Sequence, residues 1–171
     1  MSDPTPAAPR RRRRPVPRPP FEVVVERHGP AVLRFCVARM GPDRGEECFQ
    51  ETLLAALRAY DELRDPGAVG GWLFQIAQRK IVDAARSAAR APDPAGDDLE
   101  AHLDPWHDPE PGSGIWARVA TLPPKQREAL ALRYLADLSH ADVAVAMGTS
   151  VEAARRSVFE GLRRLRDEVE R

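Results

Sequence analysis

Apolar residues recur at helical spacing along most of the chain, and their pattern is clearest in residues 138–165. There it predicts two short helices joined by a tight turn at Gly148-Thr149-Ser150. Ser139 is placed to cap the first helix, which Gly148 would end, and Ser150 is placed to cap the second. At about 100° per residue, the second helix has one narrow apolar stripe, which is expected to be buried. The stripe consists of Val151, Ala154, Val158, Leu162, Leu165 and Val169.

The opposite side of this second helix is polar. It carries Glu152, Arg156, Glu160 and Arg163. A helix with such a face is able to enter the major groove of DNA, so residues 138–165 predict a helix-turn-helix. Two packed helices with a glycine turn also occur as corners of helical bundles, and this segment alone does not exclude that alternative.

Three longer amphipathic segments precede it. Residues 21–40 predict a helix that is kinked or restarted at Gly29-Pro30, because proline lacks the amide hydrogen that a helix interior needs. Residues 43–60 predict a helix whose buried side is Phe49, Leu53, Ala56, Leu57 and Tyr60. After a glycine-rich loop over residues 65–71, residues 72–90 predict a third helix, whose inner side is Trp72, Leu73, Ile76, Ala77 and Ile81.

Two exposed rows of charge follow from the same helical spacing. The helix over residues 43–60 has an acidic strip of Glu46, Glu47, Gln50 and Glu51. The helix over residues 72–90 has a mainly basic row of Arg79, Asp83, Arg86 and Arg90. Each row is either ordinary solvated surface or a docking face, for a basic partner in the first case and for nucleic acid in the second.

The remaining helices lie just before the helix-turn-helix. Residues 115–121 predict a short helix, and Pro123-Pro124 predicts the start of another, because proline suits the first turn of a helix. Leu130, Leu132 and Leu135 are its expected packing residues. The pattern as a whole predicts an all-α protein of two small helical domains, residues 21–90 and 115–171.

Charge is strongly segregated, although 26 basic and 26 acidic residues cancel over the whole chain. Residues 1–20 contain six Arg, one Asp and seven Pro, a composition that predicts a disordered tail. This tail is either solvated or makes weak, salt-sensitive phosphate contacts. Residues 91–114 contain seven acidic residues, five Pro and no Lys or Arg, so they predict a flexible linker. The linker is either an idle spacer or a mimic of nucleic acid that follows a basic channel.

Several other classes of protein are not supported. No apolar run is long enough for a membrane span and the N-terminus lacks the apolar core of a signal peptide, so a cytoplasmic location is expected. Cys36 and Cys48 lie among apolar residues and are expected to be core thiols. With His28 they show no metal-ligand spacing. No nucleophile and base pair or phosphate-binding glycine loop occurs, so we expect no catalytic residue, metal or cofactor.

Three blocks of this sequence resemble parts of one known family. EECFQETLLAALR is similar to the polymerase-docking helix of sigma region 2, and GGWLFQIAQRKIVDAAR is similar to its helix for melting and minus-ten reading. LPPKQREALALRYLADLSHADVAVAMGTSVEAARRSVFEGLRRLR is similar to sigma region 4. In this order, the chain resembles an extracytoplasmic-function (group IV) sigma factor of the sigma-70 family, over roughly residues 21–90 and 115–171.

The resemblance assigns roles to residues of the first domain. The acidic face would dock on the coiled-coil clamp of the polymerase's largest subunit through Glu47, Gln50 and Glu51. The loop over residues 65–71, with Asp65, Gly67 and Gly70, would capture a base flipped from the non-template strand. The residues that would face promoter DNA are Gln75, Arg79, Lys80 and Arg86, and Trp72 would be core. The acidic linker would thread through the polymerase channels.

In the second domain, the resemblance places a set of residues at or near the minus-thirty-five DNA. They are Ser150, Arg155, Arg156, Phe159, Glu160 and Arg163. The helical wheel favours Arg156 and Glu160, and it puts Arg155 nearer the buried stripe. Ala153 and Glu160 stand where many relatives have a hydroxyl and a basic residue, so the base preference of relatives does not transfer; Glu160 suits a cytosine amino group better than a phosphate.

The predicted function is therefore that of a non-catalytic transcription initiation factor. Its partners would be core RNA polymerase, through the clamp and the flap, and promoter DNA; an anti-sigma factor is common in this family. An alternative is a free-standing helix-turn-helix regulator, which would bind an operator without polymerase. An enzyme that uses the carboxylates of residues 46–51 for metal-dependent hydrolysis lacks a matching His or Asp cluster.

Overall fold

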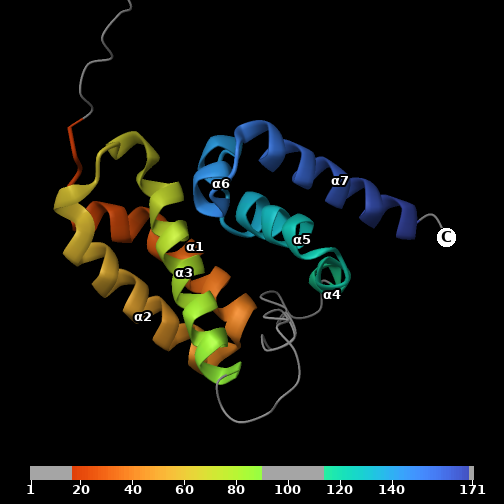
Figure 1. Ribbon diagram of the computed structural model, residues 1–171, viewed down its shortest axis with the longest axis horizontal. Coiled ribbons are helices and arrows are strands. Elements are labelled where there is room, and N and C mark those ends of the chain that lie inside the picture. Colours follow the sequence, from red (N-terminus) through yellow and green to blue (C-terminus); the bar gives the residue numbers. More distant parts are fainter. Residues whose placement is uncertain (1–16, 90–113, 170–171) are drawn as a thin grey trace, which may run out of the picture.

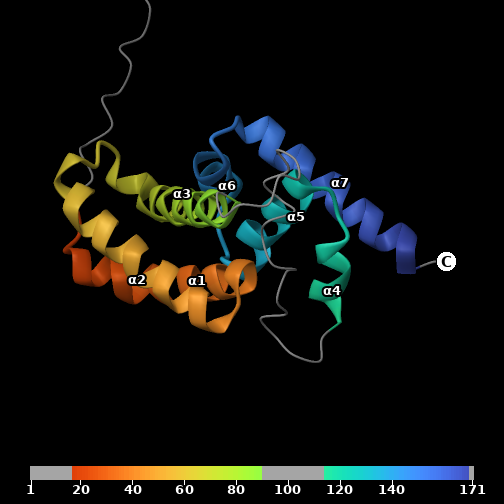
Figure 2. The same cartoon turned by 60° about the horizontal axis from the view of Figure 1, so that its bottom comes forward.

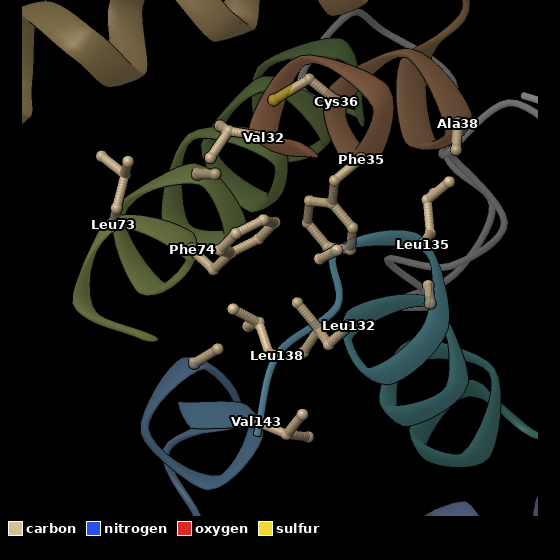
Figure 3. Packing of buried hydrophobic residues seen from close by; sticks show 14 of the residues in the cluster. Val32, Phe35, Cys36, Ala38, Leu73, Phe74, Leu132, Leu135, Leu138 and Val143 are labelled. Carbon is tan, nitrogen blue, oxygen red and sulfur yellow. The ribbon is translucent and has the colours of Figure 1, made fainter. Parts of the chain in front are cut away.

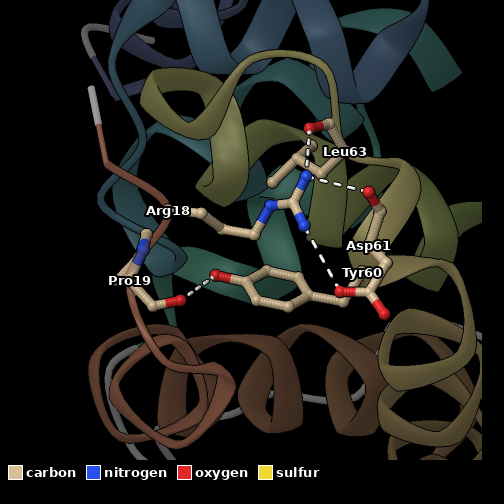
Figure 4. A network of polar contacts seen from close by, with 5 residues as sticks. All are labelled: Arg18, Pro19, Tyr60, Asp61 and Leu63. Atoms are coloured by element: carbon tan, nitrogen blue, oxygen red, sulfur yellow. Dashed lines mark hydrogen bonds and ion pairs between the residues drawn. The ribbon is translucent and has the colours of Figure 1, made fainter. Parts of the chain in front are cut away.

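The computed structural model describes residues 17–89 and 114–169, and every regular element in these two ranges is helical (Figure 1). This agrees with the predicted all-α class. Of the tail predicted over residues 1–20, residues 1–16 lie outside the described residues, as do Arg90 and residues 91–113 of the predicted linker. The disorder predicted for residues 17–20 is wrong, because Arg18 is hydrogen-bonded to the carbonyl oxygens of Asp61 and Leu63 (Figure 4).

The chain begins with a helical hairpin of α1 (Phe21–Met40) and α2 (Pro42–Ala59). Gly41 makes the turn with a φ of 79°, a value that favours glycine. Of the kink or restart predicted at Gly29-Pro30, the restart is wrong, because α1 runs through Pro30 as one helix. Proline removes one backbone hydrogen bond, but the buried Val24, Val32 and Phe35 hold both halves of α1 in the same core.

The buried face of α2 agrees only in part with the predicted one, since Ala56 and the following Tyr60 are buried as expected. Its buried residues are Gly45, Cys48, Thr52 and Ala56. A Cβ on Gly45 would lie 2.6 Å from the Cα of Val37, so the small residues let α2 approach α1 closely. Phe49 and Leu53 are therefore half-buried at the edge of the contact. Leu57, predicted as buried, is 54% exposed.

The connection from α2 to α3 is shorter than predicted. After the turn η1 (Tyr60–Glu62), Asp65 accepts a hydrogen bond from the amide of Gly67 at 2.9 Å and starts the turn η2 (Pro66–Ala68). Helix α3 (Val69–Ala89) begins at once, so Gly70 and Gly71 belong to its first turn and not to a loop. The buried side of α3 includes Leu73, Ala77 and Ile81 as predicted, together with Phe74; Trp72 and Ile76 are half-buried.

The second group of helices starts with α4 (Ile115–Ala120) and α5 (Pro124–Leu130). The backbone continues from α5 through wider, π-type turns, η4 (Ala131–Leu135), in which the amide of Ala136 bonds the carbonyl of Ala131. The predicted packing residues Leu130, Leu132 and Leu135 are all buried. Helices α6 (His140–Met147) and α7 (Val151–Val169) complete this group.

The two groups of helices share one hydrophobic core. Helix α3 packs on α6, and α1 packs on η4. Figure 3 shows the junction, where Phe35 and Phe74 meet edge to face at 5.6 Å beside Leu132, Leu138 and Val143. In Figure 2, α3 and α6 lie side by side while α7 extends away from the hairpin of α1 and α2.

Candidate functional site

The predicted acidic strip is a real surface feature of α2. Glu46, Glu47, Gln50 and Glu51 are all exposed. Two large apolar side chains, Leu54 and Leu57, continue the strip toward the end of α2, and each is 54% exposed. Apolar side chains next to charged ones are typical of a surface that binds another protein. Leu54 follows Gln50 and Glu51 by four and three positions, so helical spacing alone could have added it to the predicted face.

One end of this strip is connected to α3. Lys80 Nζ lies 3.3 Å from Glu51 Oε2, with about a third of the Lys80 side chain exposed. The pair sits in a groove of about 390 Å³ between α2 and α3. The groove is lined by Met40, Arg44, Glu47, Cys48, Glu51, Lys80, Ala84 and Ser87. The structure therefore joins a residue predicted to bind DNA to a residue predicted to bind polymerase.

The rest of the basic row on α3 is accessible. Arg79, Asp83 and Arg86 are exposed, while Gln75 is half-buried. Arg79 and Arg86 thus provide two cationic side chains in solvent on one helix, about 10.5 Å apart along its axis.

The predicted base-capture loop is only partly accessible. Asp65 and Gly67 are exposed, but Gly70 and Gly71 are buried. A Cβ on Gly70 would lie 3.0 Å from Cε1 of His28, and a Cβ on Gly71 would lie 2.7 Å from the carbonyl oxygen of Asp142 in α6. In this arrangement, the first turn of α3 is covered by α1 and α6.

His28 lies at this junction of α1, α3 and α6 and is half-buried. Burial lowers the pKa of its imidazole, the positive charge of Arg27 lowers it further, and Asp142 opposes both. The neutral form of His28 is therefore favoured in the packed state.

The helix-turn-helix has the local geometry that the sequence predicts. Ser139 Oγ accepts a hydrogen bond from the Asp142 amide at 3.1 Å, and Gly148 ends α6 with a φ of 62°. Ser150 Oγ accepts a hydrogen bond from the Ala153 amide at 3.1 Å and so caps α7. Ala154, Val158 and Leu165 are buried as expected, whereas Leu162 is 39% exposed.

The outer face of α7 is cationic. Arg155, Arg156 and Arg163 are exposed, and Phe159 between them is 65% exposed. Arg155 is exposed like Arg156, although its position on the helix is closer to the stripe of Ala154 and Val158.

Glu160 differs from these neighbours because it is partly buried. Its Oε2 accepts a hydrogen bond from Nε2 of Gln126 in α5, at 3.1 Å. Gly161 next to it lets α7 cross α5 closely, since a Cβ there would lie 3.0 Å from a methyl carbon of Leu130. Gln126 was not among the predicted site residues, because nothing local in the sequence pairs it with a residue 34 positions away.

The two cysteines lie in the core of the α1 and α2 hairpin, as expected. Both are buried free thiols. The pKa of the Cys36 thiol is raised, chiefly by its hydrogen bond with the Cys48 thiol and in second place by burial.

Among residues 17–89 and 114–169, no group of three or more His, Cys, Asp or Glu side chains is placed to hold a metal ion. No helix in these two ranges is long and apolar enough to cross a membrane.

Comparison with known proteins agrees with the two groups of helices. Residues 24–91 match the family Sigma-70 region 2, and residues 114–165 match Sigma-70, region 4. The chain is 33% identical to the ECF RNA polymerase sigma factor SigD of Mycobacterium tuberculosis (strain H37Rv) over 160 residues, which cover 85% of this chain and 75% of SigD. The chain belongs to the extracytoplasmic-function sigma factors of the sigma-70 family.

Other relatives of this sigma factor have the same family name. It is 30% identical to ShbA of Streptomyces griseus over 154 residues, and this alignment covers 80% of this chain and 81% of ShbA. Its fold is similar to RpoE of Bartonella quintana, solved with the anti-sigma factor NepR, with a TM-score of 0.67, 20% identity and coverage of 88% and 96%. CnrH, solved with the cytosolic domain of CnrY, gives a TM-score of 0.58, 23% identity and coverage of 88% and 87%.

Proposed function

We propose that this sigma factor docks on core RNA polymerase through α2 and reads promoter DNA with α3 and α7. The observation that carries the proposal is that the helices matching regions 2 and 4 each expose the appropriate chemistry. Helix α2 presents acidic and apolar groups, and α7 presents a row of Arg around Phe159. The polymerase would supply the chemistry of RNA synthesis.

The docking surface would combine Glu47, Gln50 and Glu51 with the exposed Leu54 and Leu57. Carboxylates at the rim would steer α2 toward the basic clamp coiled coil of the largest polymerase subunit. The two leucines would then lose their solvent exposure, which adds the apolar area that charge pairs alone do not provide. The second group of helices would contact the flap of the polymerase.

On DNA, α7 would lie in the major groove at the minus-thirty-five element. Arg156 and Phe159 point into solvent and would reach base edges, with Arg155 and Arg163 on the phosphates. The Ser150 cap fixes the start of this helix. Because Glu160 accepts a hydrogen bond from Gln126, we assign it the role of positioning α7 on α5 in place of contacting a cytosine amino group.

At the minus-ten element, Asp65 and Gly67 would meet the flipped base, and Arg79 and Arg86 would hold the opened strand. Gln75, which is half-buried, and Lys80, which is paired with Glu51, would also contact the opened strand once these interactions are released. Capture of an unstacked base offsets an unstacking cost of a few kcal/mol.

The arrangement with α3 against α6 cannot read both elements together. Elements about 25 base pairs apart lie about 85 Å apart along the duplex, whereas α3 and α6 are in direct contact. Residues 90–113 lie between the described ranges, and a chain of about 24 residues spans at most about 86 Å. Opening of the α3 and α6 contact on polymerase would therefore bring the two reading surfaces to their elements, each raising the effective concentration of the other.

An anti-sigma factor is the candidate partner that would hold the closed arrangement. Two folds similar to this one, RpoE and CnrH, were solved as complexes, RpoE with the anti-sigma factor NepR and CnrH with the cytosolic domain of CnrY. The protein would act in the cytoplasm, where polymerase and promoter DNA are found. The free-standing regulator is not favoured, because a regulator of that kind has no need of the region 2 match over residues 24–91.

In vitro transcription tests the proposal. The full chain is mixed with the core polymerase of the organism that encodes it and with a library of promoter fragments. We expect start-site-specific transcripts that depend on this chain and share conserved minus-ten and minus-thirty-five bases. Operator binding without polymerase, with no specific transcript, would contradict the proposal.

A further inference from the structure

The thiols of Cys36 in α1 and Cys48 in α2 are neighbours across the helical hairpin. They share a hydrogen bond, in which the Cys36 thiol donates to the Cys48 sulfur, since this bond raises the pKa of Cys36 and lowers the pKa of Cys48. The close approach of the helices at Gly45 explains the contact, because a Cβ on Gly45 would lie 2.9 Å from the carbonyl carbon of Cys36. Cys48 follows Gly45 by three positions, so it lies on the same side of α2. Packing of the two helices therefore holds the two sulfurs together.

The two thiols differ in their access to solvent. Cys36 is completely buried in the hairpin, whereas Cys48 keeps 5% of its surface exposed (Figure 3 shows Cys36). Cys48 also lines the groove of about 390 Å³ between α2 and α3. This volume is many times the roughly 30 Å³ that one water molecule occupies in the liquid. A polar molecule slightly larger than water therefore fits beside Cys48, while Cys36 lies behind it.

The surroundings of Cys48 favour its thiolate, which is the form of cysteine that reacts with oxidants. The pKa of Cys48 is lowered chiefly by the hydrogen bond from Cys36. The Thr52 hydroxyl and the positive charge of Lys80 also lower it, while burial and the charge of Glu51 oppose them. Cys36 keeps its proton, because the hydrogen bond with Cys48 and burial raise its pKa. The pair thus consists of a reactive thiolate at the groove and a protonated partner behind it.

We propose that Cys36 and Cys48 form a redox site, which a hydroperoxide in the groove oxidises through Cys48 to a disulfide between α1 and α2. The Cys48 thiolate would attack one oxygen of the hydroperoxide, whose O–O bond breaks. Cys48 becomes a sulfenic acid, and the alkoxide that leaves takes a proton from solvent. The Cys36 sulfur then attacks the Cys48 sulfur, and the hydroxide that leaves takes the Cys36 proton as water. Two thiols lose two electrons, and the hydroperoxide is reduced to an alcohol and water.

The first step prepares the second. The hydrogen bond with the Cys48 thiolate is the chief cause of the raised pKa of Cys36, and the negative charge of Cys48 is a further cause. Both are lost when Cys48 becomes a neutral sulfenic acid, so Cys36 releases its proton more readily. A disulfide needs Cα atoms roughly 4.4 to 6.8 Å apart, which only closely packed helices provide. In a reducing compartment the bond would be transient, because cellular thiols reverse it.

Mass spectrometry of the folded full chain tests this inference. The protein is treated with hydrogen peroxide, its remaining thiols are blocked with iodoacetamide in denaturant, and the monomer is digested with trypsin. Cys36 lies in the tryptic peptide of residues 35–39 and Cys48 in that of residues 45–58. We expect these two peptides to be joined, two hydrogen atoms lighter than their sum, and to separate again after dithiothreitol.

Two single substitutions separate the two steps. In Cys36→Ala the attack at Cys48 remains but the second thiol is missing, so dimedone should label Cys48 as a sulfenic acid. In Cys48→Ala the thiol that lines the groove is missing, so Cys36 should be oxidised at least about ten-fold more slowly than in the natural chain. Circular dichroism checks that both variants keep the natural helicity, and the peptide linkage in the natural chain needs no substitution.

Urea below the unfolding transition distinguishes attack on the folded protein from attack on an opened one. Reaction through the groove should keep its rate, whereas reaction that requires unfolding becomes faster as urea is added. A rate that rises with urea, thiols that survive in the folded chain, or disulfides between two chains would each overturn the inference. Equally fast oxidation of Cys36 in Cys48→Ala would overturn it as well. These measurements involve neither polymerase nor DNA, so the proposed function is tested separately.

Discussion

Lys80 Nζ lies 3.3 Å from Glu51 Oε2, so α3 and α2 share an ion pair between the surface proposed for DNA and the surface proposed for polymerase. Both side chains are partly exposed, and such a pair contributes little to stability, at most about 1 kcal/mol. Its importance is geometric. If polymerase engaged Glu51 as proposed, Lys80 would lose its partner and become available to a phosphate, so docking and strand binding would be coupled through these two residues.

The docking surface leads to the first prediction. Charge reversal by Glu47→Lys and Glu51→Lys should weaken binding to core polymerase roughly 5- to 30-fold, about 1 to 2 kcal/mol, because two rim contacts become repulsive. Circular dichroism should show unchanged helicity, since both residues are exposed on α2. The matched control is Glu22→Lys with Glu26→Lys, two exposed acids of α1, which should bind as the natural chain does. Equal co-purification of both variants with polymerase would remove α2 as the docking helix.

The α3 and α6 contact leads to the second prediction. A Cβ on Gly71 would lie 2.7 Å from the Asp142 carbonyl oxygen and 2.9 Å from its Cα, so the backbone of α6 would have to shift. Gly71→Ala should therefore separate the two groups of helices and raise the radius of gyration measured by small-angle X-ray scattering.

The same variant should bind core polymerase a few-fold more tightly, because less of the binding free energy is spent on opening. Gly67→Ala is the control, since its new Cβ would meet only the Asp65 carboxylate, at 3.1 Å. An unchanged radius of gyration in Gly71→Ala would show that α3 and α6 accommodate the methyl group without separating.

Arg156 leads to the third prediction. Arg156→Ala should cost on the order of 1 to 3 kcal/mol on a minus-thirty-five site, measured as holoenzyme affinity for promoter fragments, if this residue reads a base. It should also relax the preference at one base position. Arg166→Ala, an exposed residue in the last turn of α7, is the control. An equal loss for Arg156→Ala on random DNA would limit its role to a phosphate contact.

His28 leads to the fourth prediction. Its pKa is lowered in the folded protein from the usual 6.5, chiefly by burial, so the unfolded chain binds the proton more readily than the folded one. The free energy of unfolding should therefore fall as the pH is lowered through about 6.5, and the loss due to His28 should end below its folded pKa.

Chemical denaturation between about pH 5.5 and 7.5 would measure this effect, above the range in which most carboxylates titrate. His28→Gln should flatten the profile. His140→Gln, at the first residue of α6, controls for the loss of a histidine as such. An unchanged profile in His28→Gln would assign the pH dependence to other groups.

The parts of the fold that could be predicted depend on neighbours in sequence. The caps at Ser139 and Ser150, the end of α6 at Gly148 and the start of α5 at Pro124 all involve residues within a few positions of one another. Local hydrogen bonds and backbone preferences determine them, whatever the rest of the chain does. The exposed charges on α2 and α3 could be predicted for the same reason, because helical spacing places them on one side.

The errors occurred where one helix packs closely against another. Leu57 is exposed because α1 approaches α2 at Gly45, which rotates the buried face toward small residues. Gly70 and Gly71 join α3 because its first turn packs under α1 and α6.

By itself, the sequence determined the order of the main helices, the caps at Ser139 and Ser150 and the family, because these follow from local periodicity and from motifs read in order. Tertiary structure alone decided that α3 is closed against α6, that Glu160 is bonded to Gln126, and that Arg18 is anchored beside η1. Each of these joins residues at least 34 positions apart. Such contacts depend on how whole helices pack, which helical periodicity does not specify.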